Sequence, residues 1–142
     1  MAQDVAATRP ALQLMQAWNR ADATAWGDLF WPDARFTNVI GGTYVGASDI
    51  AAQHARIWAS IYQGSHGVLG IVATRPLGPD HLLIEAYATL TGARAAPPGV
   101  HLDPGGVIHT RLAIVTERRA SDWRIVFAQN TVINPRPSGP PK

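Results

Sequence analysis

The chain has 142 residues, with 12 Lys and Arg against 10 Asp and Glu and a formal net charge of +2 at pH 7. It has no cysteine, which excludes disulfides, thiolate metal sites and cysteine nucleophiles. The only lysine is Lys142, and the arginines form no basic stripe, so we expect no nucleic-acid partner.

Targeting and membrane segments are not recognisable in the sequence. Residues 1–5 have neither the basic start nor the apolar core of a signal peptide. No apolar run approaches the roughly 20 residues that a membrane-spanning helix needs. We therefore expect a cytoplasmic protein with no membrane partner.

Helical periodicity dominates the first third of the chain. The spacing of apolar residues predicts one helix face over residues 4–20, formed by Ala7, Ala11, Leu14, Met15 and Trp18. Asp22 is placed to cap a short second helix that extends through Phe30, and Pro32 disfavours its continuation. Residues 35–40 and 43–45 then predict a small hairpin around Gly41-Gly42, because paired glycines permit the turn.

A third helix, capped by Ser48, is predicted next. Its inward stripe consists of Ile50, His54, Ile57 and Ile61. Four long strands follow, at residues 68–74, 81–91, 107–117 and 123–132, and turns at 77–80 and 119–122 connect two pairs of them. Consecutive strands joined by turns favour an antiparallel sheet with the helices gathered on one face.

Two segments interrupt this pattern. Residues 92–106 form a long Pro-containing connection, and loops of that length are commonly functional, so we expect it to gate access to a site. Residues 134–142 are rich in proline, which predicts an extended or disordered tail. The expected organisation is a single domain over residues 1–133, followed by that tail.

The last predicted strand ends on a polar cluster. Successive strand residues alternate between faces, so one face would hold Trp123, Ile125, Phe127, Gln129 and Thr131. Such a face can line an apolar pocket with hydrogen-bonding groups at one end. It can equally be a buried strand whose last residues reach solvent.

Several short motifs accompany this element order, namely Trp18-Asn-Arg-Ala-Asp22, Phe36-Thr-Asn38 with Gly41 and Gly46, Ile50 with His54, Trp123-Arg-Ile125, and Asn130-Thr131. Together, in this order, they resemble the nuclear-transport-factor-2-like superfamily, in its SnoaL-like and SgcJ/EcaC-like branch. The resemblance implies an α+β, cystatin-like fold. In it, a curved antiparallel sheet wraps around the N-terminal and third helices and forms a conical pocket. The superfamily includes isomerases, dehydratases, epoxide hydrolases, polyketide cyclases and non-catalytic association modules, so the fold alone does not select a function.

Two positions depart from the ketosteroid isomerases of that superfamily. Those enzymes remove a proton with a carboxylate on the equivalent first strand, where this chain has Asn38. Their tyrosine on the first helix is matched by Leu14. An amide is no base near neutral pH, although it can orient a ligand or satisfy the backbone of the nearby hairpin.

His54 is the candidate catalytic residue. Its place on the inward stripe and its titration near neutral pH suit proton transfer, but ligand contact without chemistry and a purely structural role remain alternatives. The residues expected at the ligand are Asn38, Trp18, Trp58, Gln129, Asn130 and Tyr87, whereas Trp26 and Trp123 are assigned to the core. Histidine spacing indicates no metal site, and glycine spacing indicates no dinucleotide cofactor, so we expect none.

Alternation places Glu85 on the same face of its predicted strand as Tyr87, and it places His109 and Arg111 together on one face of the next strand. Glu85, His109 and Arg111 could form a polar cluster in the pocket, or they could form cross-strand pairs on the outer face of the sheet. We favour the outer face. We expect a homodimer through that face, carrying Val126, Ala128 and Asn130 or the opposite set.

The leading hypothesis is a pocket for a small, mostly apolar or aromatic molecule. If the chain is an enzyme, it would be a cofactor-free acid/base isomerase, cyclase or lyase. The alternative is a non-catalytic binding or association module.

Overall fold

The computed structural model describes residues 2–135, with side chains from Val5 onward. Its helices are α1 (Ala2–Asn19), α2 (Ala23–Asp28) and α3 (Ala47–Trp58). Its strands are β1 (Phe30–Thr37), β2 (Thr43–Val45), β3 (His66–Pro76), β4 (His81–Thr91), β5 (Ile108–Arg119) and β6 (Asp122–Val132). Residues 136–142 of the predicted tail lie outside the described residues.

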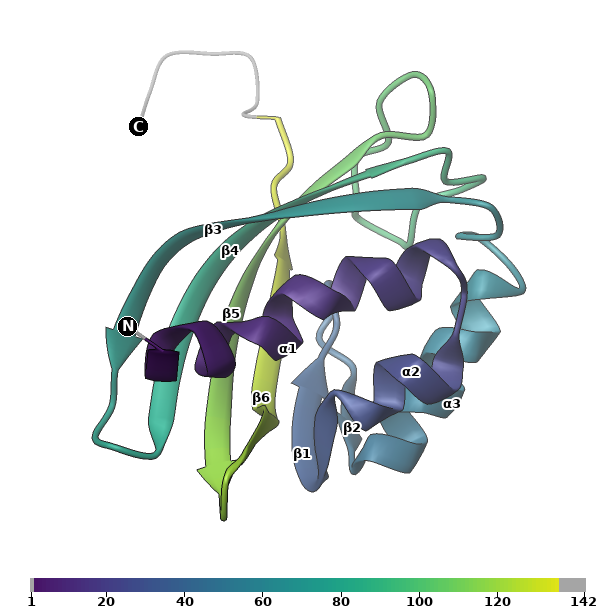
Figure 1. Ribbon diagram of the computed structural model, residues 1–142. Helices are drawn as coiled ribbons and strands as arrows, with labels where there is room; N and C mark the ends of the chain where they lie inside the picture. Colours follow the sequence, from purple (N-terminus) through teal and green to yellow (C-terminus); the bar gives the residue numbers. More distant parts are fainter. Residues whose placement is uncertain (1, 136–142) are drawn as a thin grey trace.

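The strands form one six-stranded sheet in the order β2-β1-β6-β5-β4-β3. Neighbouring strands are antiparallel except β1 and β6, which run parallel. The sheet curves around α1, and α2 and α3 pack at the end formed by β1 and β2 (Figure 1). The predicted α+β fold with a curved sheet around helices is confirmed, and the parallel pair is its one departure from an antiparallel order.

Helix α1 lies on the sheet through the face that the periodicity predicts. Ala7, Ala11, Leu14 and Trp18 are buried, because the sheet covers this side of the helix. Polar contacts fix the helix at both ends. The Thr116 hydroxyl donates to the Ala7 carbonyl (2.8 Å), and the Trp18 indole N–H donates to Ser65 Oγ (3.0 Å).

Asn19, the last residue of α1, binds the edge strand β3. Its side-chain oxygen accepts from the Gly67 N–H (2.7 Å), and its side-chain nitrogen donates to the Gly67 carbonyl (3.0 Å). An amide side chain thus satisfies two backbone groups that an edge strand would otherwise leave unpaired.

The boundary between α2 and β1 differs from the prediction. Asp22 caps α2 as expected, since its Oδ1 accepts from the Ala25 N–H (3.0 Å). However, α2 ends at Asp28, and Phe30 already belongs to β1, which contains Pro32. Pairing with β6 is interrupted between Phe30 and Arg35, so the missing N–H of Pro32 costs no ladder hydrogen bond there.

The start of α3 also differs. Ser48 lies inside the first turn, and the residue at the N-cap is Gly46, with φ +94° and no side-chain cap. The Gly46 carbonyl accepts from the Ile50 N–H (3.0 Å), which begins the helix. Glycine adopts a positive φ without strain. The helix therefore begins with a backbone turn at Gly46 and not with the side-chain cap that we predicted at Ser48.

Strand β6 contains a bulge at Val126. Thr116 pairs with Ile125 and Val115 pairs with Phe127, so one residue of β6 is left out of the register. A bulge exchanges the two faces of a strand beyond it. Ile125 and Ala128 are fully buried, whereas Gln129 is exposed. The prediction that Gln129 shares the face of Ile125 is therefore wrong, and Asn130 faces inward instead.

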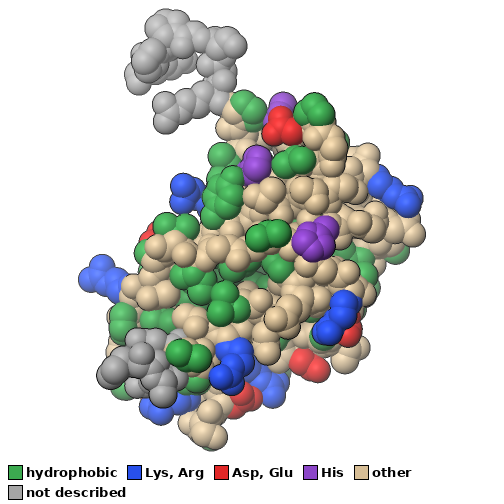
Figure 2. All heavy atoms as spheres, turned by 45° about the horizontal axis from the view of Figure 1, so that its top comes forward, with side chains coloured by type: hydrophobic (Ala, Val, Ile, Leu, Met, Phe, Trp, Pro, Cys, Tyr) green, Lys and Arg blue, Asp and Glu red, His purple; other side chains and the backbone are tan. Residues whose placement is uncertain are grey.

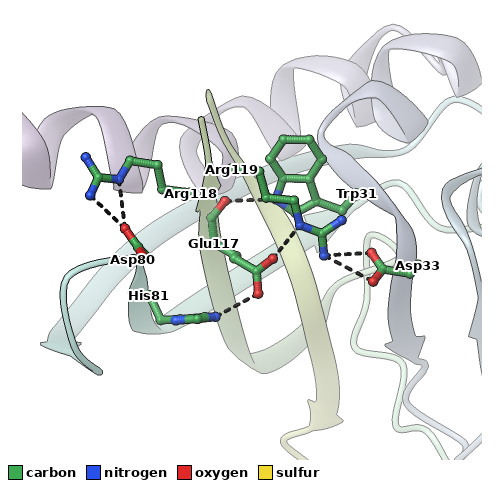
Figure 3. A network of polar contacts seen from close by, with 7 residues as sticks. All are labelled: Trp31, Asp33, Asp80, His81, Glu117, Arg118 and Arg119. Carbon is green, nitrogen blue, oxygen red and sulfur yellow. Dashed lines mark hydrogen bonds and ion pairs between the residues drawn. The ribbon is translucent and has the colours of Figure 1, made fainter. Parts of the chain in front are cut away.

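Most ion pairs gather at the end of the sheet where β4 begins and β5 ends (Figure 3). Glu117 pairs with Arg119 and with His81 (2.7 Å), and Arg119 also pairs with Asp33 (2.8 Å). The hydrogen bond from Arg119 is the main cause that lowers the pKa of Glu117. Arg119 lies over the Trp31 ring, 4.8 Å from its centroid. This network connects the ends of β1, β4 and β5.

Candidate functional site

A cavity of about 380 Å³ lies between the inner face of the sheet and the helices. This volume falls within the range of small-molecule sites, at its lower end. The lining includes side chains from every helix and from β1, β4, β5 and β6. Most of it is apolar and includes Met15, Trp18, Trp26, Phe36, Ile57 and Ile61.

His54 is buried among aromatic rings at this cavity. Its side chain is enclosed by Trp26, with ring centroids 4.3 Å apart, by Phe36 at 4.9 Å and by Trp58 at 5.7 Å. Its Nδ1 lies 2.8 Å from the Ile50 carbonyl oxygen. A carbonyl oxygen only accepts, so Nδ1 carries the proton and Nε2 presents a lone pair. Burial lowers the pKa of His54 from 6.5 to about 4, and the imidazole is therefore neutral at physiological pH.

The cavity lining carries no Asp, Glu, Lys or Arg within residues 2–135. The phenol of Tyr62 belongs to the lining, and burial raises its pKa to about 12, which keeps it protonated. At neutral pH the lining is thus uncharged. It offers neutral hydrogen-bonding groups instead, and a charged ligand would lack a counter-ion there.

Three amide side chains contribute polarity to the lining, namely Asn38, Gln53 and Asn130. Gln53 Oε1 and Asn130 Oδ1 are buried and have no hydrogen-bond partner among the described residues. An unpaired buried oxygen is unfavourable by about 1–3 kcal/mol. A ligand group that donates to these oxygens would recover part of that free energy.

Asn38 has a structural function as well as a place in the lining. Its Oδ1 accepts from the backbone N–H groups of Gly42 (2.8 Å) and Ile40 (3.2 Å), so it holds the turn between β1 and β2. This is the structural alternative that the sequence left open for Asn38. Only its side-chain nitrogen remains for a ligand.

We expect Asn38→Ala to lower the free energy of unfolding by about 1–2 kcal/mol, because two turn N–H groups lose their acceptor. Asn38→Asp keeps an oxygen acceptor at the same position and should lose less. Urea unfolding of both variants measures the difference. Equal stability of Asn38→Ala and the unchanged chain would contradict a structural function for this amide.

The segment 94–98 completes the cavity wall, with Ala96, Pro97 and Pro98 in the lining. This segment belongs to the 92–106 loop. The base of the loop is closed by two backbone hydrogen bonds, from the Gly92 N–H to the Gly105 carbonyl (2.9 Å) and from the Ala93 N–H to the Gly106 carbonyl (3.0 Å). Asn134, which follows β6, fastens the far part of this loop. Its side-chain oxygen accepts from the His101 N–H (2.9 Å), and its nitrogen donates to the Gly99 carbonyl (2.8 Å).

The structure brings together four of the seven residues expected at the site. His54, Asn38, Trp18 and Asn130 line the cavity. Trp58 is buried behind His54, and Gln129 is turned outward by the bulge in β6. Tyr87 lies on the outer face of β4, where its hydroxyl contacts His109 Nδ1 (2.8 Å). Trp26, which we assigned to the core, is both buried and part of the lining.

Gln53, Tyr62 and Thr110 also belong to the lining, although sequence reasoning missed them. Gln53 precedes His54 and follows Ile50 by three residues, so helical spacing places it on the same stripe. Thr110 follows His109 on β5, and successive side chains of a strand point to opposite faces. The prediction that His109 faces outward therefore implies that Thr110 faces inward. Tyr62 follows the end of α3 at Trp58, where helical spacing no longer applies.

The residues Glu85, His109 and Arg111 lie on the outer face of the sheet, as we favoured. On β4 and β5 their neighbours Ile84, Ala86, Thr110 and Leu112 are buried on the inner face. On the face of the molecule shown in Figure 2, Lys and Arg side chains are dispersed and interspersed with acidic ones.

Within residues 2–135, no three His, Asp or Glu side chains gather in a metal-binding arrangement. None of the helices in the described part of the chain has the length and apolar character needed to cross a bilayer.

Comparison with known proteins identifies the family. Residues 11–119 match the SnoaL-like domain family, and the chain belongs to that family. No curated protein sequence is significantly similar to the chain.

Solved structures share the fold at low sequence identity. An uncharacterised protein from Caulobacter vibrioides with a cystatin-like fold is 22% identical, over 95% of this chain and 92% of its own, with a TM-score of 0.79. A ketosteroid isomerase-like protein from Erwinia carotovora atroseptica is 16% identical, over 92% and 95% of the two chains, with a TM-score of 0.72. A putative scytalone dehydratase from Novosphingobium aromaticivorans is 9% identical, over 94% and 85%, with a TM-score of 0.76. These likenesses show the nuclear-transport-factor-2-like fold.

Proposed function

We propose that this protein binds an uncharged, mostly apolar small molecule in the cavity between sheet and helices. The observation that carries this proposal is a cavity of about 380 Å³ with aromatic walls and only neutral polar groups. Burying apolar ligand surface there supplies affinity, and the amides and His54 supply orientation. The fold relatives named for isomerase and dehydratase activity are consistent with a small-molecule site.

Catalysis by His54 is our second proposal. Nε2 has no hydrogen-bond donor among the described residues, so it is free to take a proton from a bound ligand. In that case the protein would be a cofactor-independent acid/base enzyme, with Asn38 and Asn130 orienting a substrate oxygen. However, a pKa of about 4 makes His54 a weak base, and among residues 5–135 no carboxylate contacts its ring nitrogens to stabilise an imidazolium. We therefore favour binding over proton transfer.

Native mass spectrometry of freshly purified protein tests the binding proposal. We expect a releasable small-molecule adduct on the unchanged chain and its loss in Ala88→Phe, because Ala88 lines the cavity and a phenyl group would fill part of it. Ala73→Phe makes the same exchange at an exposed position of β3 and should keep the adduct. An adduct that persists in Ala88→Phe would place the ligand elsewhere.

The same spectra test the homodimer that we expect through the outer face of the sheet. On that face Leu83 pairs with Val115, and Val115 pairs with Phe127, so half-buried apolar side chains form a row across three strands. Such a row is suited to contact a second copy of the sheet. We propose a homodimer, and a monomer mass at all concentrations would contradict it.

A further inference from the structure

We propose that the ligand is an aromatic alcohol or phenol whose uncharged hydroxyl donates a hydrogen bond to Nε2 of His54. This inference rests on the proposed binding function. It goes further, because it states which polar group the ligand carries and which atom of the protein recognises it.

The first step is the fixed state of the imidazole. Nδ1 donates to the Ile50 carbonyl at 2.8 Å, one turn earlier in α3, and this contact holds both the tautomer and the ring orientation. Trp26 and Phe36 pack against the ring and restrict its rotation. His54 is only 2% exposed, and no hydrogen bond to its Nε2 is found among the described residues. In the same lining Gln53 Oε1 and Asn130 Oδ1 are buried acceptors without a partner, and Trp26 Nε1 is a buried donor without one. A ligand group that donates to the acceptors and can also accept is therefore favoured.

The second step concerns charge. An ammonium ligand has donors, but the described lining offers no carboxylate to pair with it. A carboxylate ligand has no proton to donate at neutral pH, and no Lys or Arg of the lining would balance it. A hydroxyl group is uncharged, donates once and accepts twice. Its oxygen can also accept from an amide nitrogen of the lining, as Gln53 and Asn130 each provide one.

The third step concerns the remainder of the ligand. Ring side chains from five different segments line the cavity, namely Trp18, Trp26, Phe36, Tyr44 and Tyr62. Aromatic pairs prefer edge-to-face or offset contacts with one another, and walls of this kind favour a flat ring over a branched chain. A bicyclic aromatic alcohol is a suitable size for the observed volume.

Isothermal titration calorimetry with three matched probes tests the inference. The probes are 2-naphthol, 2-methoxynaphthalene, which has the same ring system without the O–H, and 2-naphthoate, which is charged. We expect 2-naphthol to bind at least about tenfold more tightly than 2-methoxynaphthalene, since a buried hydrogen bond to a site built for it discriminates at least this strongly. We expect no binding of 2-naphthoate.

His54→Phe should bind 2-naphthol and 2-methoxynaphthalene equally, because Nε2 is gone and the aromatic wall is kept. His54→Leu repeats the test if the phenyl group does not fit. His109→Phe makes the same exchange on the outer face and should retain the preference for 2-naphthol.

The possible results separate the two proposals. If none of the three probes binds, the proposed binding function fails for ligands of this size. If 2-methoxynaphthalene binds the unchanged chain as tightly as 2-naphthol, the hydroxyl inference fails and the binding function stands. Tighter binding of 2-naphthoate would overturn the charge argument.

Discussion

The free energy of unfolding should fall by about 3 kcal/mol as the pH is lowered from 6.5 to about 4, through His54 alone. The pKa of this imidazole is about 4 in the folded chain and 6.5 when it is exposed. Between these values the unfolded chain binds a proton that the folded chain does not. The contribution of His54 is therefore complete above pH 6.5 and is lost as the pH falls through the folded pKa.

Urea unfolding at closely spaced pH values measures this slope. His54→Phe should remove it, because the buried imidazole is gone, whereas His109→Phe should keep it. Arg119 lowers the pKa of Glu117, so the stabilisation from Glu117 is lost at more acidic pH, below its ordinary value of 4.5. The slope between pH 6.5 and about 5 therefore belongs to His54 rather than to Glu117. An unchanged slope in His54→Phe would contradict a buried, neutral imidazole.

Gly106→Ala should lower the free energy of unfolding by at least about 3 kcal/mol, a large effect for the loss of a glycine. Gly106 has φ +69°, and a Cβ atom there would overlap the backbone nitrogen and oxygen of Ala93. Because the obstacle is backbone rather than a flexible side chain, the base of the 92–106 loop would have to separate. The wall formed by Ala96, Pro97 and Pro98 would move with it.

Gly105→Ala is the matched control. Gly105 has φ +83°, but the nearest atom to a Cβ there is Val107 Cγ2 at 3.9 Å. This variant carries only the backbone cost of a left-handed alanine, about 1–2 kcal/mol. Urea unfolding of the two variants separates the cost of a left-handed alanine, which both share, from the cost of the overlap with Ala93, which only Gly106→Ala has. Equal losses would show that the contact between Gly106 and Ala93 is unimportant.

Periodicity alone predicted the parts of this fold that follow regular spacing. The buried face of α1, the first part of the α3 stripe (Ile50 and His54) and the inner faces of β4 and β5 have the residues that alternation and helical spacing assign to them. Ile61 of the predicted stripe lies beyond the end of α3 at Trp58. His54 was placed at the cavity by this reasoning, because it occupies the stripe of Ile50.

The errors occurred where the backbone departs from regular spacing. A bulge at Val126 exchanged the positions of Gln129 and Asn130, and nothing in the local sequence distinguishes a bulged from an unbulged strand. Asn134 illustrates a second limit. It binds a loop more than 30 residues earlier in the chain, and such a contact depends on where two distant segments meet.

The hydrogen bonds that attach α1 to the sheet limit which walls of the cavity can move. Contacts near both ends of the helix, from Ala7 to Thr116 and from Asn19 to Gly67, anchor it to the sheet. The helix therefore cannot swing open as a rigid cover without breaking these hydrogen bonds together. The amides that fasten the turn between β1 and β2 and the 92–106 loop lie closer to solvent, since Asn38 is half-buried and Asn134 is exposed. If a ligand binds in the cavity as proposed, we expect it to exchange on the side of these two segments.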